Sequence, residues 1–272
     1  MKISRRKFVI LSFLGLFGFL YLDAFWIERY LIDWSRHDIR EGREDTIKVI
    51  QLTDLHIREI KSYHKWIARK IAKEKPDLLF FTGDSIDRPR QLVLLEYFLS
   101  LIPLEIPKIV IMGNKEYDGK VTPAMYKELF GKYNGKLLIN DSLKLTIGKR
   151  QINIVGIDDL LNGIPDYEKA IQNIDSSIST IVLNHCPQYR DTIDNLNQGL
   201  KVNLKLVLCG HTHGGQVQFF GKEFFKPGGS GKYLNGWYKS EQSLMYVSKG
   251  IGTSRILPIR FGSRAEAPIF YL

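Results

Sequence analysis

The stretch "IVIMGNKEYDG", from Ile109 to Gly119, is an apolar run that stops at Gly113 and Asn114 and then becomes charged. A strand that ends on Gly-Asn usually ends in a turn. Asn114 is therefore either a turn residue or a ligand at the mouth of an active site. In the second case, Lys115 lies where the chemistry takes place.

This stretch has counterparts along the chain from Thr46 onward. Apolar runs rich in β-branched and aromatic residues recur there: "IKVIQL", "LLFFTG", "KIVIMG", "INIVG", "TIVLNH", "LKLVLCG" and "LMYVSKG". Segments with a helical period separate several of them: "SYHKWIARKIAKEK", "QLVLLEYFLSLI", "AMYKELFGKY" and "YEKAIQNI". Continuous apolar strands that alternate with helices predict a layered α/β fold with both sheet faces covered. We expect one domain.

Five of the apolar runs end in residues that bind metals, namely Asp54 with His56, Asp84 with Asp87, Asn114, His185, and His211 with His213. Residues two apart in an extended chain project to the same side, and the carboxyl ends of strands share one crevice. Taken singly, a Gly-Asp is most often a turn and a lone histidine is most often structural. The ordered set of five predicts a metal site. His37 and His64 lie elsewhere and receive no role.

The five motifs "DLH", "GDSID", "GNKE", "NHCP" and "GHTH" resemble those of the calcineurin-like metallophosphoesterase superfamily. The resemblance covers about Ile47 to Leu272. Three further stretches, "GHTHGGQ", "YVSKGIGTS" and "LPIRFG", look like those of a branch of small bacterial members that are often membrane-anchored or exported. One position departs from the pattern, because Lys115 stands where the family has histidine.

The resemblance implies a four-layer α/β sandwich, in which two mixed β-sheets are flanked by helices and hold two divalent metal ions. One metal would be bound by Asp54, His56, Asp84 and His213, and the other by Asp84, Asn114, His185 and His211. Carboxylate, imidazole and amide donors without a thiolate suit Mn, Fe or Zn. Asp84 would bridge the metals, and Asp87 would orient a ligand histidine. Cys186 and Cys209 are expected to be small buried residues.

The first residues differ in character from the rest. Lys2, Arg5, Arg6 and Lys7 precede an apolar run that begins at Phe8, and no small-residue cleavage site follows it. We predict an uncleaved membrane anchor over residues 1–30, an irregular linker over 31–45 and the catalytic domain over 46–272. The basic end would stay in the cytoplasm, and "SRRKF" resembles a twin-arginine export signal, so we expect the domain outside.

The chain carries a formal net charge of +10 and a pI near 9.4, which indicate an anionic partner or a merely solvated basic surface. We expect a metal-dependent phosphohydrolase that cleaves a phosphodiester or phosphoanhydride bond of a phosphorylated, lipid-like substrate at the membrane. A nuclease is an alternative, but the charge is spread along the chain without a basic-aromatic run, so nucleic acid is not the expected partner. A non-catalytic scaffold of the same fold is the third hypothesis. The sequence indicates neither the natural substrate nor an oligomeric state.

The catalytic residues implied are Asn114, Lys115 and His185. A lysine is a poor proton donor at neutral pH but a dependable positive charge, so Lys115 suits leaving groups that are stable as anions, such as the phosphate of an anhydride. By resemblance, one alternative is a pyrophosphatase that cleaves a UDP-linked acylated sugar in lipid A synthesis. That alternative requires a cytoplasmic active site. Substrate contacts are expected from "DRPRQ", "KEYDGK" and the segment Phe219 to Lys239.

Overall fold

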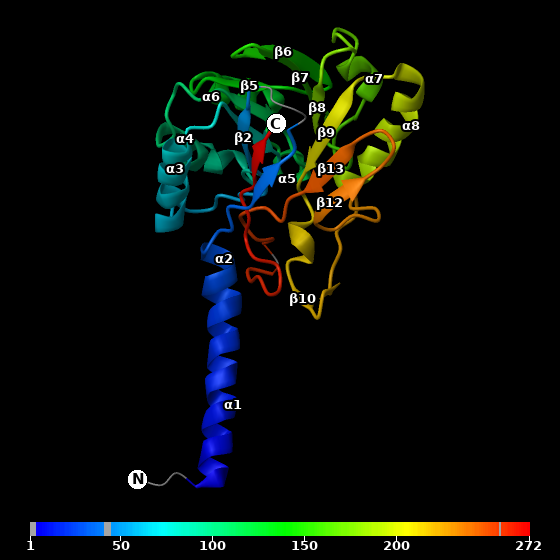
Figure 1. The fold of residues 1–272 in the computed structure, drawn as a ribbon. Coiled ribbons are helices and arrows are strands. Elements are labelled where there is room, and N and C mark those ends of the chain that lie inside the picture. Colours follow the sequence, from blue (N-terminus) through cyan, green and yellow to red (C-terminus); the bar gives the residue numbers. More distant parts are fainter. Residues whose placement is uncertain (1–3, 41–44, 256) are drawn as a thin grey trace.

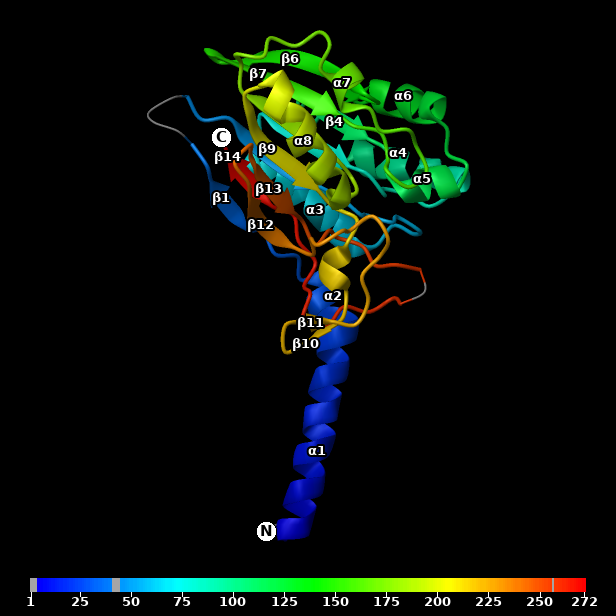
Figure 2. The same cartoon turned by 90° about the vertical axis from the view of Figure 1, so that its right-hand side faces the viewer.

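The computed structural model describes residues 4–40, 45–255 and 257–272. The domain that follows the N-terminal helix has four layers, in which two six-stranded sheets face each other and helices cover the outer face of each sheet (Figure 1). The predicted two-sheet α/β sandwich is therefore confirmed. A single helix leaves the domain at one end (Figures 1 and 2).

The first sheet has the order β1-β14-β2-β3-β4-β5. Strands β2 to β5 are parallel, and β14, which lies between β1 and β2, pairs antiparallel with β2. The bounds are β1 (Arg36–Asp38), β14 (Ile269–Tyr271), β2 (Lys48–Leu52), β3 (Leu78–Thr82), β4 (Lys108–Ile111) and β5 (Gly135–Leu137).

The second sheet has the order β12-β13-β9-β8-β7-β6. Its four inner strands are parallel, and an antiparallel strand closes each edge. The bounds are β12 (Gly236–Lys239), β13 (Leu244–Val247), β9 (Leu204–Cys209), β8 (Thr180–Leu183), β7 (Arg150–Gly156) and β6 (Asp141–Ile147). The edge strands β6 and β12 and the inner strand β14 are absent from the sequence-based prediction, because their apolar runs are short or interrupted by polar residues.

Alternation along the central strands builds three apolar layers. In β3, Leu78 and Phe80 point into the core between the sheets, while Leu79 and Phe81 point toward the helices. The helices α3 (Ser62–Glu74), α4 (Leu92–Ser100) and α6 (Pro123–Gly131) pack on the first sheet. The helices α7 (Tyr167–Ala170) and α8 (Arg190–Leu200) pack on the second (Figure 2). The helix expected over 167–174 thus ends four residues early.

The N-terminal helix consists of α1 (Arg5–Leu22), a π-helical stretch η1 (Asp23–Ile27) and α2 (Glu28–Tyr30). It is long and apolar enough to cross a membrane by length and composition, which a signal sequence also satisfies. The side chains of α1 are almost all exposed, as Phe17 at 66% illustrates. The helix is therefore compatible with the predicted anchor.

Part of the predicted linker over residues 31–45 forms a strand, β1, while residues 41–44 lie outside the described residues. Strand β1 pairs in parallel with β14, and Asp33 forms a bridge with Glu266. The alternation of polar and apolar residues around "SRHD" is too short to predict a strand. Its partner strand also lies more than 230 residues away in the sequence, so no local motif indicates the pairing.

Candidate metal centre

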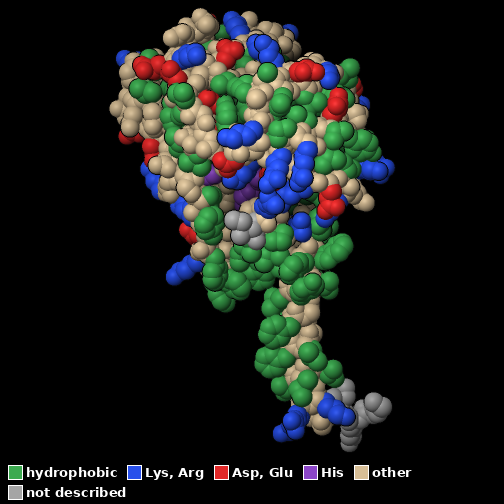
Figure 3. All heavy atoms as spheres, turned by 180° about the vertical axis from the view of Figure 1, so that it is seen from behind, with side chains coloured by type: hydrophobic (Ala, Val, Ile, Leu, Met, Phe, Trp, Pro, Cys, Tyr) green, Lys and Arg blue, Asp and Glu red, His purple; other side chains and the backbone are tan. Residues whose placement is uncertain are grey.

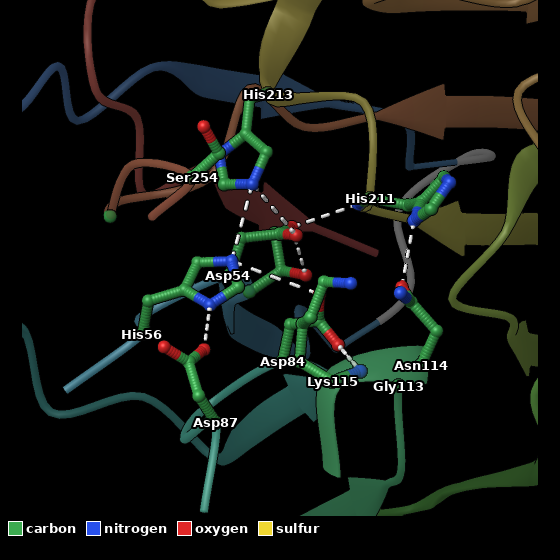
Figure 4. Close-up of polar contacts among 12 residues, drawn as sticks. Asp54, His56, Asp84, Asp87, Gly113, Asn114, Lys115, His211, His213 and Ser254 are labelled. Atoms are coloured by element: carbon green, nitrogen blue, oxygen red, sulfur yellow. Dashed lines mark hydrogen bonds and ion pairs between the residues drawn. The ribbon is translucent and has the colours of Figure 1, made fainter. Parts of the chain in front are cut away.

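The seven predicted ligands lie together at the carboxyl ends of five strands, and all of them except His185 are labelled in Figure 4. Three parallel strands of the first sheet carry four of them, and two parallel strands of the second sheet carry the other three. In chain order, the strands and residues are β2 with Asp54 and His56, β3 with Asp84, β4 with Asn114, β8 with His185, and β9 with His211 and His213. All seven are buried. The site therefore lies where the ends of the two sheets meet.

Five of these seven residues have a left-handed backbone, namely Asp54, His56, Asp84, His211 and His213, with φ between 44° and 74°. Such conformations are costly for residues other than glycine and cluster at functional sites. Backbone hydrogen bonds between strand ends hold them, since Asp54 N–H donates to the Gly83 carbonyl and His56 N–H donates to the Asp84 carbonyl, both at 3.0 Å. The fold thus imposes the turn that aims each ligand inward.

The first cluster of ligands contains Asp54, His56 and His213. The His56 Nε2 and His213 Nε2 atoms are 3.2 Å apart, and His213 Nε2 is 3.6 Å from Asp54 Oδ1. The Asp87 carboxylate accepts a hydrogen bond from His56 Nδ1 at 2.6 Å and one from Arg58 Nε at 2.7 Å. Burial raises the pKa of Asp87, but His56 and Arg58 outweigh it and lower the pKa to about 2. Asp87 lies where a residue that orients His56 is expected.

The second cluster contains Asn114, His185 and His211. Asn114 Oδ1 is 3.2 Å from His185 Nε2 and 3.1 Å from His211 Nδ1. The other nitrogen of each ring donates to a backbone carbonyl, His185 to Thr82 at 2.8 Å and His211 to Gly228 at 2.6 Å. These donations leave the inward nitrogen of both rings with a lone pair.

Asp84 lies between the two clusters and faces both. Its Oδ2 is 3.7 Å from His56 Nε2, and its Oδ1 is 3.4 Å from His185 Nε2. The Lys115 backbone N–H also donates to Oδ1 at 2.8 Å. Burial raises the pKa of Asp84, but the neighbouring imidazoles outweigh burial and hold the pKa well below its usual range. One carboxylate therefore presents one oxygen to each cluster.

The donor chemistry fits cations in both clusters. The Asp54 Oδ1 atom is buried and has no hydrogen-bond partner among the described residues. The lone pair of His211 Nδ1 faces the side-chain oxygen of Asn114 at 3.1 Å, because its Nε2 donates to the Gly228 carbonyl, so two acceptors face each other at short distance. Buried acceptors without donors are unfavourable, and a cation between them removes the cost.

A buried glutamate supports the first-sheet side of the site. The carboxylate of Glu116 is fully buried and accepts hydrogen bonds from Tyr126 and from the backbone N–H groups of Gly113, Asp84, Ser85 and Ile86 at 2.5–3.2 Å. Burial and the charge of Asp84 raise the pKa of Glu116 to about 7. Sequence reasoning gave this residue no role, although it is the last residue of "GNKE".

Two glycines allow the strand ends to approach each other. A Cβ atom on Gly83 would lie 2.5 Å from His185 Nδ1, and one on Gly113 would lie 2.4 Å from Asp84 Oδ1. Both distances are shorter than real Cβ contacts. The Gly-Asp and Gly-Asn dipeptides therefore remove side chains that would otherwise fill the site.

The structure places the Lys115 side chain at the edge of the site. Its ammonium group forms an ion pair with Asp118 at 2.7 Å, and the side chain is 44% exposed. Burial lowers the pKa of Lys115, but the bond to Asp118 outweighs it, so the pKa lies above its ordinary value. Only the backbone of Lys115 bonds a predicted ligand among the described residues.

The other singled-out residues lie outside the ligand clusters. Cys186 and Cys209 are fully buried, as expected, and burial raises the pKa of the Cys209 thiol to about 12. His37 packs among the rings of Trp237, Tyr246 and Phe270. His64 caps the N-terminus of α3.

Positive side chains surround the opening of the site. Figure 3 shows histidines at the bottom of a hollow with lysine and arginine side chains beside it. A neighbouring hollow of about 290 Å³ is lined by Asp87 and by four arginines, Arg58, Arg88, Arg90 and Arg255. Asp87 is already paired, so the hollow carries surplus positive charge. Such a surface attracts anionic substrates.

Arg260 connects the second-sheet side of the site to the N-terminal helix. Its guanidinium is buried, lies 3.4 Å from His213 Nδ1 and donates to the carbonyls of Lys249, Gly250 and Gly252. Its backbone N–H donates to the carbonyl of Ala24 in η1 at 3.1 Å. Sequence reasoning missed Arg260, because these contacts are distant along the chain.

Comparison with known proteins is consistent with this geometry. A family model for calcineurin-like phosphoesterases matches residues 47–215. The metallophosphoesterase YkuE of Bacillus subtilis is 32% identical over 297 residues, covering 100% of this chain and 98% of the relative. A metallophosphoesterase of Helicobacter pylori is 29% identical over 282 residues, covering 97% and 71%. The UDP-2,3-diacylglucosamine pyrophosphatase LpxG of Chlamydia muridarum is 25% identical over 279 residues, covering 81% and 82%.

Proposed function

This chain belongs to the calcineurin-like phosphoesterase family, and we propose that it hydrolyses a phosphodiester or phosphoanhydride bond of a phosphorylated substrate at a membrane. The observation that carries the proposal is the position of Asp84 between two clusters of metal-binding side chains, with one carboxylate oxygen near His56 and the other near His185. Membership of the family supports an enzyme that uses divalent metals. The number of ions, the bond and the location are our proposal.

We propose two divalent ions, Mn, Fe or Zn, with Asp54, His56, Asp84 and His213 as ligands of one and Asp84, Asn114, His185 and His211 as ligands of the other. The separate contacts of the two Asp84 oxygens support its role as the bridge. When bound, the ions supply the positive charge that acidifies the attacking water and neutralises the phosphoryl oxygens.

The chain's own residues provide position and charge. Asp84 keeps the two clusters at one separation, while Asp87 and the carbonyls of Thr82 and Gly228 orient the ligand rings. The arginine-lined hollow attracts the phosphorylated substrate to the opening. Lys115 supplies positive charge near the leaving group when its ammonium leaves Asp118, and this charge favours leaving groups that depart as anions.

A second candidate function is hydrolysis of a UDP-linked acylated sugar in lipid A synthesis. Similarity to LpxG over 81% of this chain favours it. This substrate has a pyrophosphate bond, which suits Lys115 and the positive hollow. The candidate requires the catalytic domain on the cytoplasmic side, whereas the basic residues before α1 favour the outside.

The first experiment is hydrolysis of bis(p-nitrophenyl) phosphate by the full-length protein with Mn²⁺, with and without a chelator. We expect metal-dependent hydrolysis that Asp84→Ala abolishes. Folded protein that binds metal but hydrolyses neither this diester nor an anhydride would instead indicate a binding scaffold. Salt-sensitive retention of single-stranded DNA would favour a nuclease.

Two further assays separate the candidates and the membrane side. Hydrolysis of a UDP-diacylated sugar in preference to simple diesters would favour the pyrophosphatase. We propose export with anchoring by α1, so lysine substitution of Arg5 and Arg6 should retain the protein inside the cell. Unchanged location of that variant, measured by protease access in spheroplasts, would argue against export through the twin-arginine signal.

A further inference from the structure

An exposed aromatic hairpin projects from the domain beside the N-terminal helix. The short strands β10 (Gln218–Phe219) and β11 (Lys222–Glu223) pair antiparallel through a turn at Phe220 and Gly221, where φ is positive. In Figures 1 and 2 the hairpin extends on the same side of the domain as the helix, and it reaches the level of the helix's upper turns. The hairpin therefore lies on the side of the domain that faces the membrane which we propose α1 crosses.

The hairpin exposes an unusual amount of aromatic surface. Phe220, Phe224 and Phe225 are 105%, 75% and 67% exposed, and Phe219 is 48% exposed. An apolar cluster of this kind at the surface of a protein marks an interaction site. Two lysines, Lys222 and Lys226, and one glutamate, Glu223, stand among these aromatic residues in the sequence, so the hairpin carries a net positive charge. Aromatic residues interleaved with cationic ones suit the boundary between acyl chains and anionic headgroups.

The hairpin and the helix are attached to the same segment, residues 260–265. On the hairpin side, Gln218 N–H donates to the Phe261 carbonyl at 2.7 Å, and the rings of Phe219 and Phe261 lie 4.8 Å apart. On the helix side, the Glu28 carboxylate accepts from the backbone N–H groups of Gly262 and Ser263 at 2.9 and 2.8 Å. The hairpin is thus held at a defined place beside the helix.

Both ends of the hairpin segment also reach the metal centre. It begins directly after His213, at the short helix η4 (His213–Gly215). It ends near Gly228, whose carbonyl accepts a hydrogen bond from His211 Nε2 at 2.6 Å. The hairpin tip is therefore connected at each end to a proposed metal ligand.

We propose that the hairpin is a second membrane contact, in which Phe220, Phe224 and Phe225 enter the interface of the bilayer that α1 crosses. This contact holds the metal centre near the lipid surface and selects an amphiphilic phosphorylated substrate that lies in the bilayer. The inference rests on the proposed anchoring by α1. Its occupant is the bilayer rather than a protein, because the hairpin lies beside the apolar helix and carries its own cationic residues.

The test places an environment-sensitive fluorophore, NBD, on Phe220→Cys in the full-length protein. Both native cysteines are fully buried, so the introduced thiol is the accessible one. The protein is reconstituted into vesicles of phosphatidylcholine and phosphatidylglycerol, and flotation verifies the anchoring separately. We expect the emission to shift to shorter wavelength and to be quenched by lipids that carry a nitroxide on the acyl chain.

The matched control is Glu128→Cys on α6, whose side chain is 75% exposed and which lies away from the helix in Figure 2. Its label should stay in water and escape the quencher. A label at position 220 that behaves like the control in floated vesicles would overturn the proposal. A label that is shielded from water but not quenched by the nitroxide lipids would indicate contact between protein copies and would overturn it too.

A second measurement concerns activity and separates this inference from the proposed chemistry. We expect Phe220→Ser with Phe224→Ser to lose several-fold more activity on p-nitrophenyl hexadecyl phosphate in vesicles than on soluble bis(p-nitrophenyl) phosphate. An equal loss of activity on both substrates would show that the hairpin supports the metal-binding residues, and it would overturn the membrane contact. Failure of the wild type on both would contradict the phosphohydrolase, and the fluorescence result would still stand.

Discussion

The two halves of the metal centre differ in what holds them in place. The first-sheet half consists of Asp54, His56, Asp84 and Asn114, and a single buried carboxylate, Glu116, binds the backbone of its loops. The second-sheet half consists of His185, His211 and His213. Two of its rings are supported by partners in long connections, Gly228 and Arg260, that continue to the surface hairpin and the N-terminal helix.

This difference assigns different tasks to the two halves. A site braced from within the core keeps its geometry regardless of what happens at the surface. A site held by connections that continue to the surface can change its geometry when those surface segments bind something. We therefore expect substitutions in the first-sheet half to change metal binding and stability, and substitutions around the second-sheet half to change substrate choice.

The largest effect is expected for Asp84→Ala, because Asp84 is the residue that both clusters share. We expect activity to fall on the order of 10³-fold or more, since two-metal catalysis needs both ions at a fixed separation. Asp54→Ala and His211→Ala each alter only one cluster, so these variants should lose less activity than Asp84→Ala. Metal content of the purified variants is the measurement, and two ions per chain in Asp84→Ala would contradict the bridging role.

The next effect concerns Glu116, the buried carboxylate that accepts hydrogen bonds from the loops of the first-sheet half. Glu116→Gln replaces one acceptor oxygen by an NH₂ group that faces backbone N–H donors, so we expect the free energy of unfolding to fall by about 3 kcal/mol. Thermal unfolding of the metal-free protein measures it without any assay of activity. The control is Glu128→Gln, an exposed carboxylate on α6. Equal stability of the two variants would show that Glu116 is not a brace.

Asp87→Ala tests the orientation of one ligand. The variant removes the acceptor of His56 Nδ1 and leaves the ring free to turn, so metal affinity should fall about 10–100-fold. Titration with Mn²⁺ or Zn²⁺ by calorimetry measures the affinity. The control is Asp87→Asn, which keeps an acceptor oxygen and should lose less. An unchanged affinity in Asp87→Ala would place Asp87 outside the orienting role.

Lys115 follows Asn114 in the first-sheet half and its side chain lies at the edge of the site, so its substitution should have a moderate effect. We expect Lys115→Ala to slow hydrolysis of an anhydride about tenfold, equivalent to one unit of positive charge lost near the leaving group. Lys115→His should gain on an alkyl diester, whose leaving group needs a proton. If Lys115→Ala is harmless on both substrates and the histidine variant gains nothing, Lys115 is a turn residue paired with Asp118.

The smallest effect is expected in the arginine-lined hollow. Substitution of Arg88 and Arg90 by glutamine should raise KM for an anionic substrate several-fold with little change in kcat, because these side chains contribute attraction rather than chemistry. The difference should shrink at high salt. Lys127→Gln on α6 is the matched control for charge. A decrease in kcat with an unchanged KM would show instead that these arginines take part in the chemical step.

Sequence reasoning predicted the parts of the molecule whose signals are local. The central strands are continuous apolar runs, and each ligand stands two to four residues beyond a strand end, so both could be predicted from single motifs. The brace Glu116, the contact of Arg260 with His213 and the pairing of β1 with β14 depend on residues distant in sequence. The direction of the Lys115 side chain is likewise set by Asp118, a residue that the motif does not include.

The bonds between Glu28 and the backbone of Gly262 and Ser263 decide where the chain can be cut to release a water-soluble domain. A version that starts at Leu31 discards this carboxylate and leaves both N–H groups without it, next to a hydroxyl that bonds the carbonyl of His213. A version that starts at Asp23 keeps the two hydrogen bonds of the Glu28 carboxylate and lacks the exposed apolar turns of α1. We expect the longer version to melt at the higher temperature and to retain more metal. Any protease that frees this domain intact would have to cleave within α1, ahead of its π-helical end.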